Sequence, residues 1–173
     1  MNGILPVCSH HPVTRHGNSG GWLNKVTGEK ATVAGGWTNI ANGESSVISG
    51  GAFNWNSANS SFSVVAGGTF NTNRGLEAFI GGGDNNYVDN SGKTSGIVSG
   101  MSNHVGHQYS FIGGGSYNSI HGEYGTVVGG SWNTAYGSYS SVGSGRYNVA
   151  GAAGSSEAYS VVFGGLANTA QSG

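Results

Sequence analysis

A tetrapeptide of the form Gly-x-x-Asn recurs ten times along this chain of 173 residues, at nearly constant spacing. We call its two fixed positions the repeat glycine and the ladder asparagine. The repeat glycines are Gly21, Gly36, Gly51, Gly68, Gly83, Gly100, Gly115, Gly130, Gly145 and Gly165. The ladder asparagines are Asn24, Asn39, Asn54, Asn71, Asn86, Asn103, Asn118, Asn133, Asn148 and Asn168. Successive asparagines are mostly 15 residues apart, with two spacings of 17 and one of 20. Self-similarity at a fixed period indicates a solenoid, in which each repeat is one coil that packs against its neighbours.

A second regularity lies six residues before the ladder asparagine, where the last nine repeats have valine or isoleucine. These residues are Val33, Ile48, Val65, Ile80, Ile97, Ile112, Val127, Val142 and Val162. β-Branched residues favour extended backbone, and the glycines that follow permit positive φ or close backbone approach at a corner. A coil of about 15 residues has room for two short strands and two tight turns, but not for a helix. We therefore predict an all-β fold, a parallel β-roll or β-solenoid of ten coils over residues 21–173, after a cap or junction at residues 1–20.

The ladder asparagines are predicted to have a structural role. If the coils stack at the spacing of neighbouring strands, the asparagines fall in register, one above another. Each side-chain amide can then hydrogen-bond to the next, as amide ladders do in stacked strands. The sequence thus predicts an internal asparagine ladder running the length of the solenoid.

The composition indicates self-association. Apolar side chains make up 36% of the chain, its 35 glycines have no side chain to bury, and aromatic side chains stand beside glycines and other small residues. A roll this thin exposes some of its aromatic surface, and exposed apolar patches usually mark an interface. We therefore expect a homo-oligomer. Aromatic residues also recur directly before the ladder asparagine, and their regular position favours subunit packing over ligand recognition: Phe53, Phe70, Tyr117, Trp132 and Tyr147.

The repeat resembles the head repeats of trimeric autotransporter adhesins of the YadA type, whose coils have a Gly-x-x-small-x-Ala-x-Gly core. The segment 128–137, with Asn133, Ala135 and Gly137, is among the copies that match it best. The resemblance covers about residues 20–173 and implies a left-handed parallel β-roll, a homotrimer about one axis, and adhesion to host surfaces. Similar repeats occur in phage tail fibres and other bacterial surface fibres. This chain departs from the family in having asparagine at the small position and a coil longer by one residue.

Candidate ligand contacts lie where the repeat departs from its regular length, because insertions in a solenoid project from one face. The departures are near 56–62, 89–96 and 151–159. The first has a tryptophan beside two asparagines, a combination that suits a sugar, and the other two contain charged residues. The candidate binding residues are Trp55, Asn56, Asn59, Asp89, Lys93 and Glu157.

These features favour a non-enzymatic adhesive or receptor-binding segment of an extracellular or virion-surface fibre, with a surface glycan or cell-surface receptor as partner. The alternatives are a structural spacer without a ligand of its own and a fibre enzyme with a carboxylate pair in a groove. A net charge of −1 with scattered charges gives no nucleic-acid footprint, and the apolar runs are too short for a membrane span.

No cofactor or metal is expected. The N-terminal segment contains Cys8, His10, His11 and His16, a set of residue types that suits zinc or copper, but a cap or junction remains the preferred interpretation. His104, His107 and His121 lie on adjacent repeats, where hydrogen-bonded surface roles are preferred over metal ligation.

Overall fold

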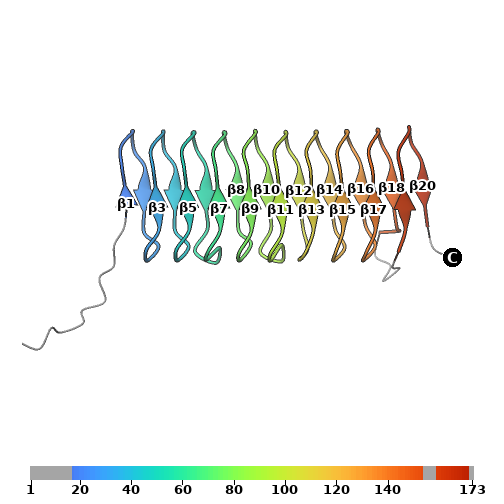
Figure 1. Cartoon of the computed structure of the whole chain (residues 1–173), viewed down its shortest axis with the longest axis horizontal. Helices are drawn as coiled ribbons and strands as arrows, with labels where there is room; N and C mark the ends of the chain where they lie inside the picture. Colours follow the sequence, from blue (N-terminus) through green and yellow to red (C-terminus); the bar gives the residue numbers. More distant parts are fainter. Residues whose placement is uncertain (1–16, 154–158, 172–173) are drawn as a thin grey trace, which may run out of the picture.

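The computed structural model describes residues 17–153 and 159–171, which form one parallel β-solenoid. The coils stack side by side along the long axis of the molecule (Figure 1). Each coil gives one strand of two residues to each of two parallel sheets, and the described residues contain no helix. The predicted all-β fold with coils of about 15 residues is confirmed. Accordingly, no helix in the described part of the chain is long and apolar enough to cross a membrane.

The first sheet contains the odd-numbered strands: β1 (Gly17–Asn18), β3 (Thr32–Val33), β5 (Val47–Ile48), β7 (Val64–Val65), β9 (Phe79–Ile80), β11 (Gly96–Ile97), β13 (Phe111–Ile112), β15 (Thr126–Val127), β17 (Ser141–Val142) and β19 (Val161–Val162). The second sheet contains the even-numbered strands: β2 (Lys25–Val26), β4 (Ile40–Ala41), β6 (Trp55–Asn56), β8 (Thr72–Asn73), β10 (Tyr87–Val88), β12 (His104–Val105), β14 (Ser119–Ile120), β16 (Thr134–Ala135), β18 (Val149–Ala150) and β20 (Thr169–Ala170). Every pairing is parallel, and equivalent residues of neighbouring coils are partners, as Val127 and Val142 are.

From β3 to β19, the second residue of each strand points into the narrow interior between the sheets. In the first sheet this is the predicted β-branched series, and from Val33 to Val142 its members are fully buried. The second sheet contributes a mixed series at the same place, which includes Ile120 as well as the smaller Ala135 and the polar Asn73. Because successive residues of a strand face opposite sides, the first residue of each strand lies on an outer face of the solenoid. Two-residue strands therefore give one core residue and one surface residue each.

The two turns of a coil differ in constancy. The turn from the first sheet to the second, which we call the Gly-Asn turn, has six residues in each of the coils from β3 to β20, as in 34–39 and 163–168. It also has a line of parallel bridges of its own, such as Ser116 to Ser131. The return turn, which we call the variable turn, has five residues at 42–46 but more at 57–63, 89–95 and 151–160. All three predicted departures from the repeat thus fall at the same end of the coil.

Geometry at the Gly-Asn turn explains both fixed residues of the repeat. Gly130 has φ of +85°, and a Cβ there would lie 2.1 Å from the carbonyl oxygen of Gly145 and 2.8 Å from Nδ2 of Asn133. The glycine therefore lets the next coil and the asparagine amide approach closely. Only glycine satisfies both the dihedral angle and the contact.

Asn133 shows what the ladder asparagine contributes. Its Nδ2 donates to the carbonyls of Gly129 and Gly145 and to Oδ1 of Asn118, at 2.9, 2.9 and 3.2 Å. Its own Oδ1 accepts from the backbone N–H of Asn148 at 3.0 Å. The same bond from backbone N–H to the preceding Oδ1 is present at each step from Asn24 to Asn168. A buried amide is thereby satisfied at nearly all of its donors and acceptors, as buried polar groups must be.

The solenoid begins earlier than the predicted boundary at residue 21, because Gly17 and Asn18 already pair with β3. Neither residue is β-branched, so the sequence pattern did not reveal this strand. Cys8, His10, His11 and His16 lie outside the described residues.

Candidate functional site

A surface pocket of about 350 Å³ lies between two of the longer variable turns. The 57–63 turn supplies one side, and the 89–95 turn supplies the other through Asn90. Between them lies a coil of regular length, which contributes Arg74 from the start of its variable turn. The lining residues are Trp55, Ser57, Ala58, Asn59, Arg74 and Asn90. Two insertions on alternate coils thus flank a depression over the coil that separates them.

The side chain of Arg74 lies between two aromatic rings on the outer face of the second sheet. Its Cζ is 5.1 Å from the centre of the Trp55 ring and 5.4 Å from the centre of the Tyr87 ring. Among the described residues it forms no ion pair, and its Nε is buried without a hydrogen-bond acceptor. Cation–π contacts hold a guanidinium in place without neutralising its charge. The pocket consequently contains a positioned positive charge that no carboxylate of the described chain pairs with.

Asp89 is next to this site, but its carboxylate is engaged locally. Its Oδ1 accepts the backbone N–H of Asn90 at 2.7 Å and the phenol of Tyr87 at 3.4 Å. Partial burial, followed by the negative charge of Asp89, raises the pKa of Tyr87, and the charge of Arg74 opposes this rise. Tyr87 therefore stays a neutral phenol that supports Arg74 from one side.

The structure brings two of the predicted binding residues together and separates the others. Trp55 and Asn59 both line the pocket. Asn56 is fully buried, and its Nδ2 donates to the carbonyl of Val47 at 3.1 Å, so the prediction that it contacts a ligand is wrong. It is the second residue of β6, and the two-residue alternation of a strand turns it inward while Trp55 faces out.

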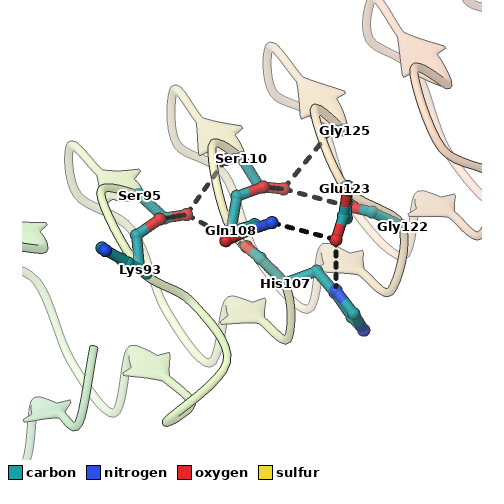
Figure 2. A network of polar contacts seen from close by, with 8 residues as sticks. All are labelled: Lys93, Ser95, His107, Gln108, Ser110, Gly122, Glu123 and Gly125. Carbon is teal, nitrogen blue, oxygen red and sulfur yellow. Dashed lines mark hydrogen bonds and ion pairs between the residues drawn. The ribbon is translucent and has the colours of Figure 1, made fainter. Parts of the chain in front are cut away.

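Of the charged candidates, Asp89 adjoins the pocket without lining it, and Lys93 does not line it. Lys93 lies at the edge of a polar network shown in Figure 2, in which its carbonyl accepts from the hydroxyl of Ser95 at 3.2 Å. In the same view Gln108 donates to Glu123 at 3.0 Å. The first bond lies within one variable turn, and the second ties two neighbouring variable turns to one another. Glu157 lies outside the described residues.

Two of the three histidines named from the sequence are in contact. The rings of His104 and His121 are 5.8 Å apart, and the hydroxyl of Ser119 lies 3.4 Å from Nδ1 of His104 and 2.9 Å from Nε2 of His121. Burial lowers the pKa of each, and for His104 the charge of His121 lowers it further. Within the described ranges, no group of three or more histidine, cysteine or acidic residues is placed to hold a metal ion.

Aromatic residues also form exposed columns along the solenoid, at positions with left-handed backbone. Tyr117 and Trp132, each directly before a ladder asparagine, have φ of 56° and 58° and stack at 4.3 Å. In the variable turns, Tyr109, Tyr124 and Tyr139 have φ of 56°, 54° and 58° and stack at 5.0 and 4.6 Å. Bulky residues rarely adopt this conformation, which favours glycine and asparagine. Aromatic residues at these positions are unfavourable for the backbone, which indicates that the contacts of their rings are the reason for their presence.

The outer faces of the two sheets differ in chemistry. The face of the second sheet has polar and charged side chains near its strands, including Arg74, His104 and His121. That of the first sheet exposes large apolar residues: Phe79, Val98, Phe111, Val128, Val161 and Phe163. The pocket lies with the polar face, while the apolar face has no cover in a single chain.

The sequence matches no protein-family model, and no curated protein shows significant similarity to it. The site therefore has to be interpreted from its own geometry. Asn90 lies in the predicted departure 89–96 but was not among the candidate residues. Sequence reasoning missed Arg74, because it is on a coil of regular length. Its register with the 57–63 turn is the only signal that pointed to it.

Proposed function

We propose that this chain is a glycan-binding adhesive segment of an extracellular or virion-surface fibre, and that it acts without catalysing a reaction. The observation that carries the proposal is the pocket built by two insertions on an otherwise regular scaffold. Its volume is near the lower end of the range for small-ligand sites, about 300 to 1,000 Å³, which suits one or two sugar rings. Its lining combines an aromatic wall from Trp55 with the amides of Asn59 and Asn90. Such a combination suits the apolar faces and the hydroxyl groups of a sugar.

The proposal includes a homotrimer with the left-handed winding that the resemblance to YadA-type head repeats implies. Support comes from the apolar outer face of the first sheet, where Phe111 and Val128 are 44% and 58% exposed. An apolar face of this kind is expected to be covered by another protein surface. If three chains meet along this face, the pockets remain exposed on the opposite, polar faces. Three sites on one rod would then raise avidity for a glycan-coated surface.

Glycan-array binding tests the adhesive role. We expect the parent chain to bind, and a variant in which residues 57–63 are replaced by the five-residue sequence of 42–46 to stay folded and lose the signal. Trp55→Ala should weaken binding, whereas Trp22→Ala, which removes an exposed tryptophan remote from the pocket, should not. A parent chain that binds no glycan or cell surface would contradict the adhesive role and favour the structural spacer.

Light scattering tests the assembly. The 17.4 kDa chain should have three times that mass in solution. Val128→Asp on the apolar face should lower the mass toward that of the monomer, because it places a charge in the proposed interface. The matched change Thr134→Asp on the face of the second sheet should leave the mass unchanged. A stable monomeric parent chain would contradict the trimer.

A further inference from the structure

The Arg74 guanidinium defines which sugars the pocket selects. We infer that the pocket binds an acidic sugar residue, whose carboxylate pairs with Arg74, in preference to a neutral one. This inference rests on the proposed function and adds the chemical class of the ligand.

The first support is the charge of the lining. Arg74 is the only charged side chain among the residues that line the pocket. The described carboxylates within 4.0 Å of a basic group belong to other clusters: Glu29 and Glu44 with Lys30, and Glu123 with His107. Asp89, the nearest acidic neighbour in the site, is held by Asn90 and Tyr87. An entering anion therefore meets a cation without a competing partner in the described chain.

The second support is the way in which Arg74 is held. Contacts with Trp55 on one coil and Tyr87 on another fix the guanidinium from both sides. A guanidinium held between two rings keeps its charge, and its planar fork of N–H donors matches the two oxygens of a carboxylate. Holding the group before the ligand arrives also reduces the ordering that binding requires.

The third support is that its donors are not in use. The structure gives the Arg74 side chain no hydrogen bond to any described residue, and Nε is covered without an acceptor. Because Nε is covered by the protein itself, the donors open to a ligand are the terminal Nη groups. A ligand carboxylate can pair with these two groups without displacing a described partner. The amides of Asn59 and Asn90 flank the same space and can bond to hydroxyl groups of the same sugar ring.

Arg146 provides a matched control within the chain. Its Cζ also lies over an aromatic ring, at 4.7 Å from the centre of the Tyr147 ring, and it is exposed. However, its Nη2 donates to the hydroxyl of Tyr147 at 3.2 Å, and it lines no described pocket. The two arginines therefore share charge and ring contact but differ in the pocket and in free donors.

The experiment is titration of the full chain with matched pairs of oligosaccharides: sialyllactose against lactose, and a glucuronic-acid-terminated disaccharide against its glucose-terminated counterpart. We expect the acidic member of at least one pair to bind about tenfold or more tightly, the range for a charge-assisted hydrogen bond. Arg74→Gln should abolish this preference, Arg74→Lys should keep part of it because the charge remains, and Arg146→Gln should keep all of it. Circular dichroism melting of each variant monitors folding.

The preference of the parent chain for acidic over neutral sugars tests the inference even if a variant fails to fold. If neutral and acidic members bind equally, the inference is overturned and the glycan-binding function stands. Acidic selectivity that survives Arg74→Gln in a folded chain also overturns it, because another group would then carry the preference. If no glycan binds, neutral or acidic, both the inference and the proposed function fail.

Discussion

The two turns of each coil have opposite properties. The Gly-Asn turn keeps one length, one pattern of positive φ and one bond from each ladder asparagine N–H to the preceding Oδ1 from β3 to β20, whereas the variable turn ranges from five residues at 42–46 to ten at 151–160. The difference follows from what each turn contacts. In the Gly-Asn turn the asparagine side chain of one coil bonds to the backbone of the next coil and to the side-chain amide of the preceding coil, so a change in one coil disturbs three. In the variable turn extra residues extend into solvent, and the strands on either side keep their register.

The largest expected contrast comes from changing the length of each turn. Deleting Ser131 and Trp132 breaks the ladder at Asn133 and leaves buried amides and carbonyls unpaired, at about 1–3 kcal/mol each. Several such losses approach the total stability of a small domain, about 5–15 kcal/mol, so we expect cooperative thermal unfolding to disappear. Replacing residues 57–63 by the sequence of 42–46 should change the free energy of unfolding by about 1 kcal/mol or less, because loop length alone has a small effect. Similar losses of stability in the two variants would contradict the proposed difference between the Gly-Asn turn and the variable turn.

Adjacent glycines sharpen the comparison within one turn. A Cβ at Gly130 would meet the carbonyl of Gly145 at 2.1 Å, whereas a Cβ at Gly129 would meet nothing within 4 Å. Gly130→Ala should therefore reduce the free energy of unfolding by at least the roughly 1–3 kcal/mol of a strained backbone, and the clash adds to this. Gly129→Ala should be close to neutral. Chemical denaturation of the two variants measures the difference, and equal stabilities would mean that the coils can shift to admit a Cβ.

The smallest effect concerns the histidines beside the variable turns. The pKa of His104 and of His121 is lowered below its ordinary value near 6.5, first by burial. The unfolded chain thus binds protons more readily, so these residues favour folding above about pH 6.5 and lose that contribution as the pH falls toward their folded pKa. We expect a modest fall in melting temperature between pH 7.5 and 5.

Removing these histidines checks the assignment. The fall should become clearly smaller in His104→Gln and His121→Gln, and should change less in His107→Gln, which leaves the contacting pair intact and removes only the secondary charge that lowers the pKa of His121. An identical pH profile in all of these variants would assign the effect to other groups.

The contrast between the turns also explains how much the sequence could predict. Backbone geometry restricts which residues the Gly-Asn turn accepts. A glycine is needed for positive φ, an asparagine for its hydrogen bonds, and a β-branched residue for the core strand before the turn, so all three recur at a fixed period. From these the coil, the parallel stacking and the register follow. The glycine four residues after the ladder asparagine also recurs, and its reason is a close contact: Gly122 lies outside the positive-φ region, yet a Cβ there would lie 2.1 Å from the carbonyl oxygen of Gly137.

The site was less predictable because it is assembled across coils. Length departures pointed to Trp55 and Asn59, but inclusion of Asn56 ignored the alternation of a two-residue strand. Arg74 is 15 residues from Asn59 and belongs to a regular coil, so no local feature distinguishes it from other surface arginines. Only the stacking of coils shows that it lies between Trp55 and Tyr87. A functional side chain on a coil of regular length is identified from the alignment of neighbouring coils, because the repeated motif itself does not distinguish it.

Amide hydrogen exchange, resolved by residue, tests the central claim that a rigid ladder carries adaptable loops. The backbone N–H groups of the ladder asparagines, such as Asn133 bonded to Oδ1 of Asn118 at 3.0 Å, should exchange only with global unfolding. The N–H groups of Ala58 and Asn59, which donate to no described acceptor, should exchange at rates near those of an unfolded chain. Comparable protection in the two turns, or early exchange along the ladder, would contradict the account.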